Sequence, residues 1–182
     1  MSAMSFDIAG SVGLKVTITE QADGSLRFDL VNQGAQVGDL RGFFFDTNDV
    51  DLLSSLSVVG TQVTRVAAGD DAVVNLGNGV NMHGVDAFDL GIAFGTAGIG
   101  KDDIQSTSFT LRSSTGGLDL ADFAGVDFGV RFTSVGDFGS VRDGSLKLVG
   151  ESPDLPVLPP IDLPPIGLPP VGLPPIDIPP VL

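Results

Sequence analysis

Residues 14–32, LKVTITEQADGSLRFDLVN, decide the fold class. Leu14, Val16 and Ile18 alternate with polar residues, and the same spacing recurs after the turn at residues 21–25, in the stretch LRFDL. Alternation with a period of two places each apolar set on one face of a strand. Since the turn contains Asp-Gly, a strong hairpin signal, the segment predicts two antiparallel strands with one buried face.

Short β-rich runs separated by Gly, Asn and Asp continue along the chain to residue 150, and helical periodicity is almost absent. Further strands are expected at residues 40–46, 57–59, 62–67, 72–76, 87–94, 106–112, 127–135 and 145–149. One short helical turn is expected at residues 118–123, LDLADF, before Gly125. This pattern predicts an all-β protein, a two-sheet antiparallel sandwich of the jelly-roll or Ig-like type.

Three successive phenylalanines occupy residues 43–45. In a strand they point alternately to opposite faces, so at least one must lie on the outer face or be covered by another element. Packing in the core explains the other two phenylalanines. Because an acidic segment follows directly, we expect Phe43 and Phe45 to be candidate acceptors for a partner's aliphatic side chains.

The composition changes sharply near Gly150. All 12 prolines lie between Pro153 and Pro180, whereas all 12 phenylalanines and every Lys and Arg come earlier. We therefore expect a sandwich domain at residues 1–150 and a proline-rich tail at residues 151–182. The tail repeats a Pro-Pro-aliphatic-x-aliphatic unit, and paired prolines favour an extended polyproline II conformation while excluding a central β-strand.

The tail is unusual for a linker because its non-proline residues are mostly aliphatic. It is either a spacer or a docking segment, and a free rod would expose a contiguous apolar stripe, which favours docking. The tails could instead bundle with one another. The predicted subunit-interface residues are Ile161, Leu163, Ile166, Leu168, Val171, Leu173, Ile176 and Ile178.

The charge balance excludes nucleic acid as a partner. The formal net charge is -14, and the nine basic residues are scattered among 23 acidic ones, so no cationic patch for phosphates is expected. The chain has no cysteine, which excludes disulfides and thiolate metal sites. No apolar run approaches the roughly 20 residues of a membrane span, and residues 1–16 lack a signal-peptide pattern, so export would require a removed signal or another route.

The acidic segment DTNDVD at residues 46–51 offers several hard oxygen ligands suited to calcium. The candidate ligands are Asp46, Asn48, Asp49 and Asp51. The alternative is an acidic turn whose side chains accept local backbone hydrogen bonds, because the twelve-residue calcium-loop spacing is missing. The same two interpretations apply to three acidic pairs, namely Asp70 with Asp71, Asp86 with Asp89, and Asp102 with Asp103.

No motif predicts an enzyme. Residues 95–102, GTAGIGKD, match seven positions of a phosphate-binding loop, but Asp102 replaces the hydroxyl that holds magnesium, so a glycine-rich turn is expected. His83 is the only histidine, and no nucleophile elbow is present. The chain has neither Trp nor Tyr, which argues against an aromatic platform for sugars.

Several stretches resemble a little-characterised β-rich module of secreted bacterial proteins. They are IQSTSFTLRSSTGGLDLADFAGVDFGVRFTSVG and GSLKLVG within residues 103–150, together with LRGFFFDTND and VNLGNGVNMHG, and the resemblance covers about residues 25–150. It implies a β-sandwich and an extracellular or cell-surface location, and supplies no catalytic motif.

These observations predict a non-enzymatic extracellular protein that assembles head to tail into filaments or biofilm matrix fibres through its tail. The alternative is a calcium-dependent adhesin or carbohydrate-binding module with the tail as a spacer. A glycan-active enzyme using paired carboxylates is a third hypothesis.

Overall fold

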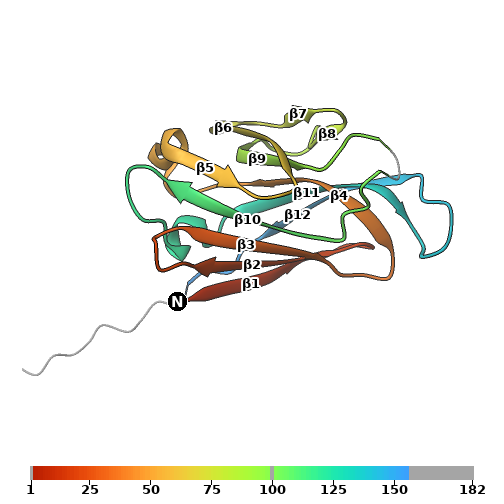
Figure 1. Cartoon of the computed structure of the whole chain (residues 1–182), viewed down its shortest axis with the longest axis horizontal. Coiled ribbons are helices and arrows are strands. Elements are labelled where there is room, and N and C mark those ends of the chain that lie inside the picture. Colours follow the sequence, from red (N-terminus) through yellow and green to blue (C-terminus); the bar gives the residue numbers. More distant parts are fainter. Residues whose placement is uncertain (1, 99–100, 156–182) are drawn as a thin grey trace, which may run out of the picture.

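The computed structural model describes residues 2–98 and 101–155, which fold as two antiparallel sheets packed face to face (Figure 1). The first sheet has the order β1 (Ala3–Ile8), β2 (Leu14–Glu20), β3 (Leu26–Asn32), β10 (Ser106–Ser113) and β5 (Leu56–Val59). The second has the order β12 (Gly144–Glu151), β11 (Asp127–Gly136), β4 (Val37–Phe45), β9 (Phe88–Phe94) and β6 (Val63–Val73). The prediction of an all-β antiparallel sandwich is confirmed.

The hairpin predicted from residues 14–32 is formed by β2 and β3, which pair Val16 with Leu30 and Ile18 with Phe28. The apolar residues of both strands are buried, and the polar residues between them are exposed or partly exposed. Period-two alternation therefore predicted the buried face, and the short turn predicted the antiparallel pairing.

The chain passes repeatedly between the sheets, at the connections from β3 to β4, β4 to β5, β5 to β6, β9 to β10 and β10 to β11. We expected two separate strands at residues 62–67 and 72–76. Most of these residues form one long strand, β6, whose pairing with β9 has a register irregularity between Ala68 and Val73. A short pair, β7 (Asn75–Gly77) and β8 (Val80–Asn81), follows it. The sequence reading missed β1, β8 and the 3-10 helix η1 (Val50–Ser55).

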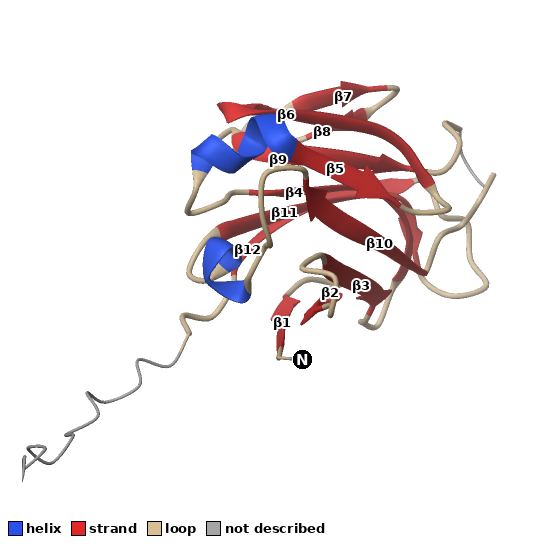
Figure 2. Ribbon diagram, turned by 60° about the vertical axis from the view of Figure 1, so that its left-hand side comes forward, coloured by secondary structure: helices blue, strands red, loops and turns tan. Residues whose placement is uncertain are grey.

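The helical turn expected at residues 118–123 is the 3-10 helix η2 (Leu120–Phe123). Asp119 accepts the Ala121 N–H, and Asp122 accepts the Asp119 N–H, which completes a capping box. Both η1 and η2 lie at the end of the sandwich where the described chain ends (Figure 2). Neither helix of the described residues is long and apolar enough to cross a membrane.

Stacked phenylalanines form the centre of the core between the sheets. Phe28 packs against four other rings, with centroid distances of 4.7 Å to Phe109, 5.5 Å to Phe45, 5.9 Å to Phe123 and 6.4 Å to Phe43. These rings come from both sheets and from η2. One cluster therefore holds the two sheets and the end helix together.

The outer face of the second sheet is covered as well. Phe44 is fully buried, but it packs in a separate apolar cluster with residues of β6 to β9. Gly91 makes this possible, since a Cβ at that position would lie 3.0 Å from the Phe44 ring. The prediction that one phenylalanine of residues 43–45 must be covered is confirmed, and the β6–β8 segment is the cover.

The folded unit continues past Gly150. β12 ends at Glu151, and Ser152 is buried, with its hydroxyl donating to the Phe123 carbonyl at 2.8 Å and accepting the Val126 N–H at 3.2 Å. The proline repeat, including the eight predicted interface residues between Ile161 and Ile178, lies outside the described residues.

We predict that Phe28→Ala lowers the free energy of unfolding by about 3–5 kcal/mol, the usual cost of removing a buried ring. Val59→Ala is the matched control, because Val59 is 62% exposed at the sheet edge and should change stability little. Chemical denaturation of both variants measures the difference. Equal denaturation midpoints for the two variants would contradict the central role of Phe28 in the core.

Candidate functional site

The acidic segment at residues 46–51 does not form a single cation site. The Asn48 amide donates to the carbonyls of Ala121 and Ala124, both at 2.8 Å, which joins η2 to the end of β4. Asp49 caps η1 by accepting the Asp51 N–H at 3.1 Å. Only Asp46 belongs to a group of three or more acidic or imidazole side chains, among the described residues, that could share an ion. Asp49 accepts a local backbone N–H, as the alternative interpretation expected, whereas Asn48 donates to carbonyls of a distant segment.

Asp46 meets two acids from distant parts of the sequence. One carboxylate oxygen of each of Asp46, Asp71 and Asp89 lies within 4.8 Å of the others. Asp46 follows β4, Asp89 lies in β9, and Asp71 lies in the irregular part of β6 with a positive φ of 46°. Strand pairing in the second sheet brings them together. The sequence marked each one as an acidic turn but gave no sign of their convergence.

Backbone N–H groups fix the geometry of this acid cluster. Asp89 accepts the Asp71 N–H at 2.9 Å with one oxygen and the Thr47 N–H at 3.0 Å with the other. The Asp89 N–H in turn donates to Asp46 at 3.1 Å. These bonds leave Asp71 and one oxygen of Asp46 free to bind a cation. The ligand set is hard oxygen, which suits divalent cations in general.

Burial raises the pKa of Asp46 from 3.8 to about 6, and the negative charges of Asp89, Asp127 and Asp71 add to the shift. Asp46 also lines a hollow of about 490 Å³ together with Asp86 and Asp127. Ionised Asp46 is thus held in an unfavourable, anionic environment. A bound cation would relieve this repulsion.

Phe43 and Phe45 do not form an acceptor surface, so this part of the interface prediction is wrong. Their exposed fractions are 0% and 1%, and both pack among the rings of the main core. Their neighbour Phe44 is equally buried on the opposite face. All three phenylalanine side chains are therefore buried, in apolar clusters on the two faces of the second sheet.

The largest exposed apolar side chains are instead in the β11–β12 hairpin. Phe138 is 91% exposed and Val141 is 85% exposed. The turn is closed by the Ser140 N–H donating to the Asp137 carbonyl at 3.1 Å, with Gly139 at a φ of 81°. Sequence reasoning missed this pair, although a lone Phe between Asp and Gly in a turn is a recognisable signal that the ring is outside a strand.

This hairpin is anchored to its surroundings. Arg142 forms an ion pair with Asp103 at 2.8 Å, and the Gln36 amide donates to Asp137 at 3.2 Å. A cleft of about 430 Å³ lies beside Phe138, bordered by Val37, Gln105 and Arg142. An anchored, protruding aromatic ring next to a cleft is suited to contacting an apolar segment of a partner.

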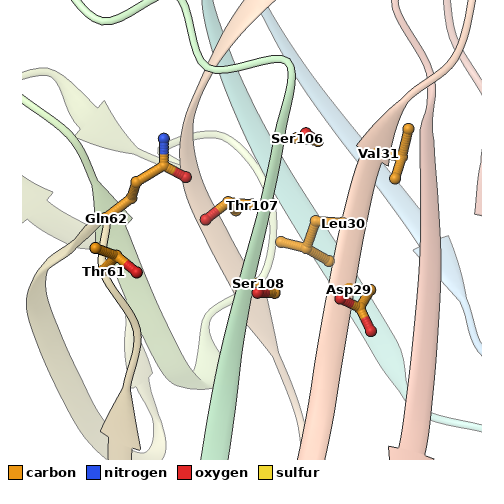
Figure 3. Close-up of a pocket in the computed structure, with 8 residues that line it drawn as sticks. All are labelled: Asp29, Leu30, Val31, Thr61, Gln62, Ser106, Thr107 and Ser108. Atoms are coloured by element: carbon orange, nitrogen blue, oxygen red, sulfur yellow. The ribbon is translucent and has the colours of Figure 1, made fainter.

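A groove lined mainly by polar residues lies beside β10 (Figure 3). β5 pairs with β10 only from Thr110 onward, so the edge of β10 before that residue has no strand partner on this side. In Figure 3, Thr61 and Gln62 stand on one side of the groove and residues 29–31 of β3 on the other. The volume is about 550 Å³. The lining offers hydroxyls, an amide and the Arg27-paired carboxylate of Asp29, which suit hydrogen bonding to a polar ligand.

The remaining motifs carry no catalytic geometry among residues 2–98 and 101–155. Asp102 accepts the Thr96 N–H, so a carboxylate occupies the loop that resembled a phosphate-binding motif, and no helix follows that loop. His83 is exposed, and its carbonyl accepts the Lys147 ammonium at 2.7 Å.

No protein-family model matches the sequence, and no curated protein matches it at a significant level.

We predict that Asp46→Asn stabilises the protein at neutral pH. Because the folded pKa of about 6 is above the ordinary value of 3.8, the folded state binds more protons between these values, and stability falls as pH rises through that window. The melting-temperature gain of the variant over the wild type should grow from about pH 4 to about pH 6 and then level off.

Thermal unfolding in chelator at a series of pH values measures this gain. Asp51→Asn removes an exposed acid outside the cluster and serves as the control. If the gain in melting temperature of Asp46→Asn over the wild type did not change with pH, the raised pKa of Asp46 would be contradicted.

Proposed function

We propose that this chain is a non-enzymatic, self-associating structural protein that builds filaments or matrix fibres outside the cell. The observation that carries the proposal is the placement of two features. Residues 152–155, from which the tail continues, lie at one end of the sandwich, and the hairpin with Phe138 and Val141 lies at the other (Figures 1 and 2). β12 runs between them.

The proposed contact joins the tail of one copy to the hairpin end of the next. Paired prolines favour polyproline II, so in the proposal the tail is a semi-rigid rod that does not readily reverse to reach the far end of its own domain. About 25 residues at 3.1 Å each would extend about 75 Å, nearly three times the length of an eight-residue strand. We therefore propose that the tail reaches another copy of the chain.

The chemistry of the two surfaces is complementary. Proline-rich segments bind aromatic side chains in other proteins because the rod is already ordered before it docks. Phe138 and Val141 supply exposed apolar surface, and the repeat supplies Ile, Val and Leu. Burial of the eight aliphatic residues at roughly 1.5 kcal/mol each gives a gross gain above about 10 kcal/mol, from which association costs are subtracted.

A contact between two different surfaces at opposite ends does not close on itself, so it propagates into a filament. The resemblance to a module of secreted bacterial proteins supports the extracellular part of the proposal, and the acidic composition is consistent with such a setting.

We predict that the full chain forms filaments, and that a variant ending at Leu155 does not, because it keeps the whole folded unit and loses the repeat. Phe138→Ser should shorten or abolish the filaments without changing the melting temperature, since the ring is 91% exposed. Val59→Ser, which alters an exposed residue on another strand, is the matched control.

Electron microscopy and light scattering measure both effects. Monodisperse full-length protein would contradict self-assembly. Filaments that persist in Phe138→Ser but vanish without the tail would place the acceptor elsewhere and favour bundling of the tails.

A second candidate is a calcium-dependent adhesin or carbohydrate-binding module with the tail as a spacer, and the Asp46–Asp71–Asp89 cluster favours it. We predict that calcium raises the melting temperature of the wild type relative to chelator, because it neutralises the cluster in the folded state. Asp71→Asn should lose this gain and Asp51→Asn should keep it. Equal gains in both variants would mean that calcium acts elsewhere, and glycan binding by residues 1–155 would distinguish an adhesin from a structural ion site.

A further inference from the structure

We infer that a small cavity on the outer side of the second sheet is a binding site for an oxyanion, a carboxylate, phosphate or sulfate group. The cavity has a volume of about 150 Å³ and lies between β4, β6, β9 and the β7–β8 turn. Arg41 and Arg65 both line it, with Thr64, Asn78 and Gly95, and its lining contains no acidic residue. Two cationic side chains, Arg41 and Arg65, therefore line one small cavity in a strongly acidic protein.

Arg41 reaches this cavity because β4 has a bulge. Gly42 pairs with Arg131, and Leu40 pairs with Phe132, so Arg41 is the extra residue in the strand. Regular alternation back from Phe45 and Phe43 would direct Arg41 into the core between the sheets. A bulge redirects one side chain, and here it places the guanidinium on the outer face, under β7 and β8.

The buried Arg41 guanidinium has no counter-charge at ion-pair distance among the described residues. Arg41 is 4% exposed, and its Nη1 has no hydrogen-bond acceptor among the described residues. No carboxylate oxygen of the described residues lies within 4.0 Å, the limit for an ion pair, of a guanidinium nitrogen of Arg41. A buried charge normally has a partner because desolvation is costly, so this arrangement indicates that an anion completes the site.

Two acids, Asp39 and Asp102, interact electrostatically with Arg41 at longer range. One Asp39 oxygen accepts the Ile104 N–H at 2.8 Å, and the Asp102 carboxylate accepts the Thr96 N–H. Burial raises the pKa of Asp39, which weakens it as a counter-charge for Arg41. An Asp102 oxygen lies beside Gly95, which lines the cavity, so its charge opposes a bound anion.

Arg65 gives the site its second cationic wall. It lies on β6 and reaches across to the β7–β8 turn, where its Nη1 lies 3.1 Å from the position that a Cβ on Gly77 would take. Two planar guanidinium groups supply paired N–H donors whose spacing matches carboxylate and phosphate oxygens. The cavity has room for about five waters, so it accepts a single small oxyanion or the charged end of a larger ligand.

The test uses the full-length protein at pH 7.5, titrated separately with sodium phosphate, sulfate and acetate. Sodium chloride at matched ionic strength is the reference. Calorimetric titration measures binding, and thermal unfolding measures stabilisation. We expect saturable binding of at least one oxyanion and a melting temperature that rises with its concentration. The preferred anion separates a carboxylate ligand from a phosphate or sulfate group.

Arg65→Ser should weaken binding at least tenfold, and Asp102→Asn should strengthen it by removing a competing charge while keeping an acceptor for Thr96. Arg27→Ser makes the same charge change at an exposed, distant position and should have no effect. Arg65 is exposed, so its variant is expected to fold even where a variant of buried Arg41 does not.

The inference is overturned if no oxyanion acts beyond the chloride reference, which would mean that water fills the cavity. It is also overturned if Arg65→Ser and Arg27→Ser weaken binding equally, which would show general charge screening. Neither result depends on filament formation.

Discussion

The need to keep both faces of β4 away from water governs much of this structure. From Gly38 to Phe45 every residue of the strand is buried, and so is every residue of its neighbour β9. One sheet can cover only one of these faces, so the chain between β5 and β9 folds back over the other and supplies the cluster around Phe44. The same cover encloses Arg41, which turns a bulge in the strand into a cationic cavity.

Backbone N–H groups bind several of the acidic residues, which offsets part of the repulsion between them. Asp39, Asp89, Asp102 and Asp119 each accept such bonds. Asp46 also accepts a backbone N–H, but burial and three neighbouring acids outweigh that bond and raise its pKa. Its protonation therefore changes in a pH range where ordinary carboxylates are already ionised.

Local patterns predicted the fold class and most strands, because alternation and turn residues are properties of neighbouring positions. They did not predict features made by pairing between distant segments. Asp46 and Asp89 are 43 positions apart, and only the pairing of β4 with β9 brings them together. The reading of Phe43 and Phe45 as an acceptor was wrong for the same reason, since the sequence could not show which element covers which face. The exposure of Phe138 was not predicted, because a phenylalanine side chain is expected to lie in the core.

The charge pattern bears on how the proposed assembly would form. Residues 1–150 carry 19 acids against nine bases, and the tail adds four acids and no base, so copies of the chain repel one another at long range. Bundled tails would bring Asp162 and Asp177 of several copies close together. Docking at the hairpin end would instead keep the tails of different copies apart, and the attraction there would come from apolar surface that acts only at contact distance. Charge repulsion between whole domains would then oppose close lateral packing, so the proposed end-to-end contact favours thin filaments over sheets or aggregates.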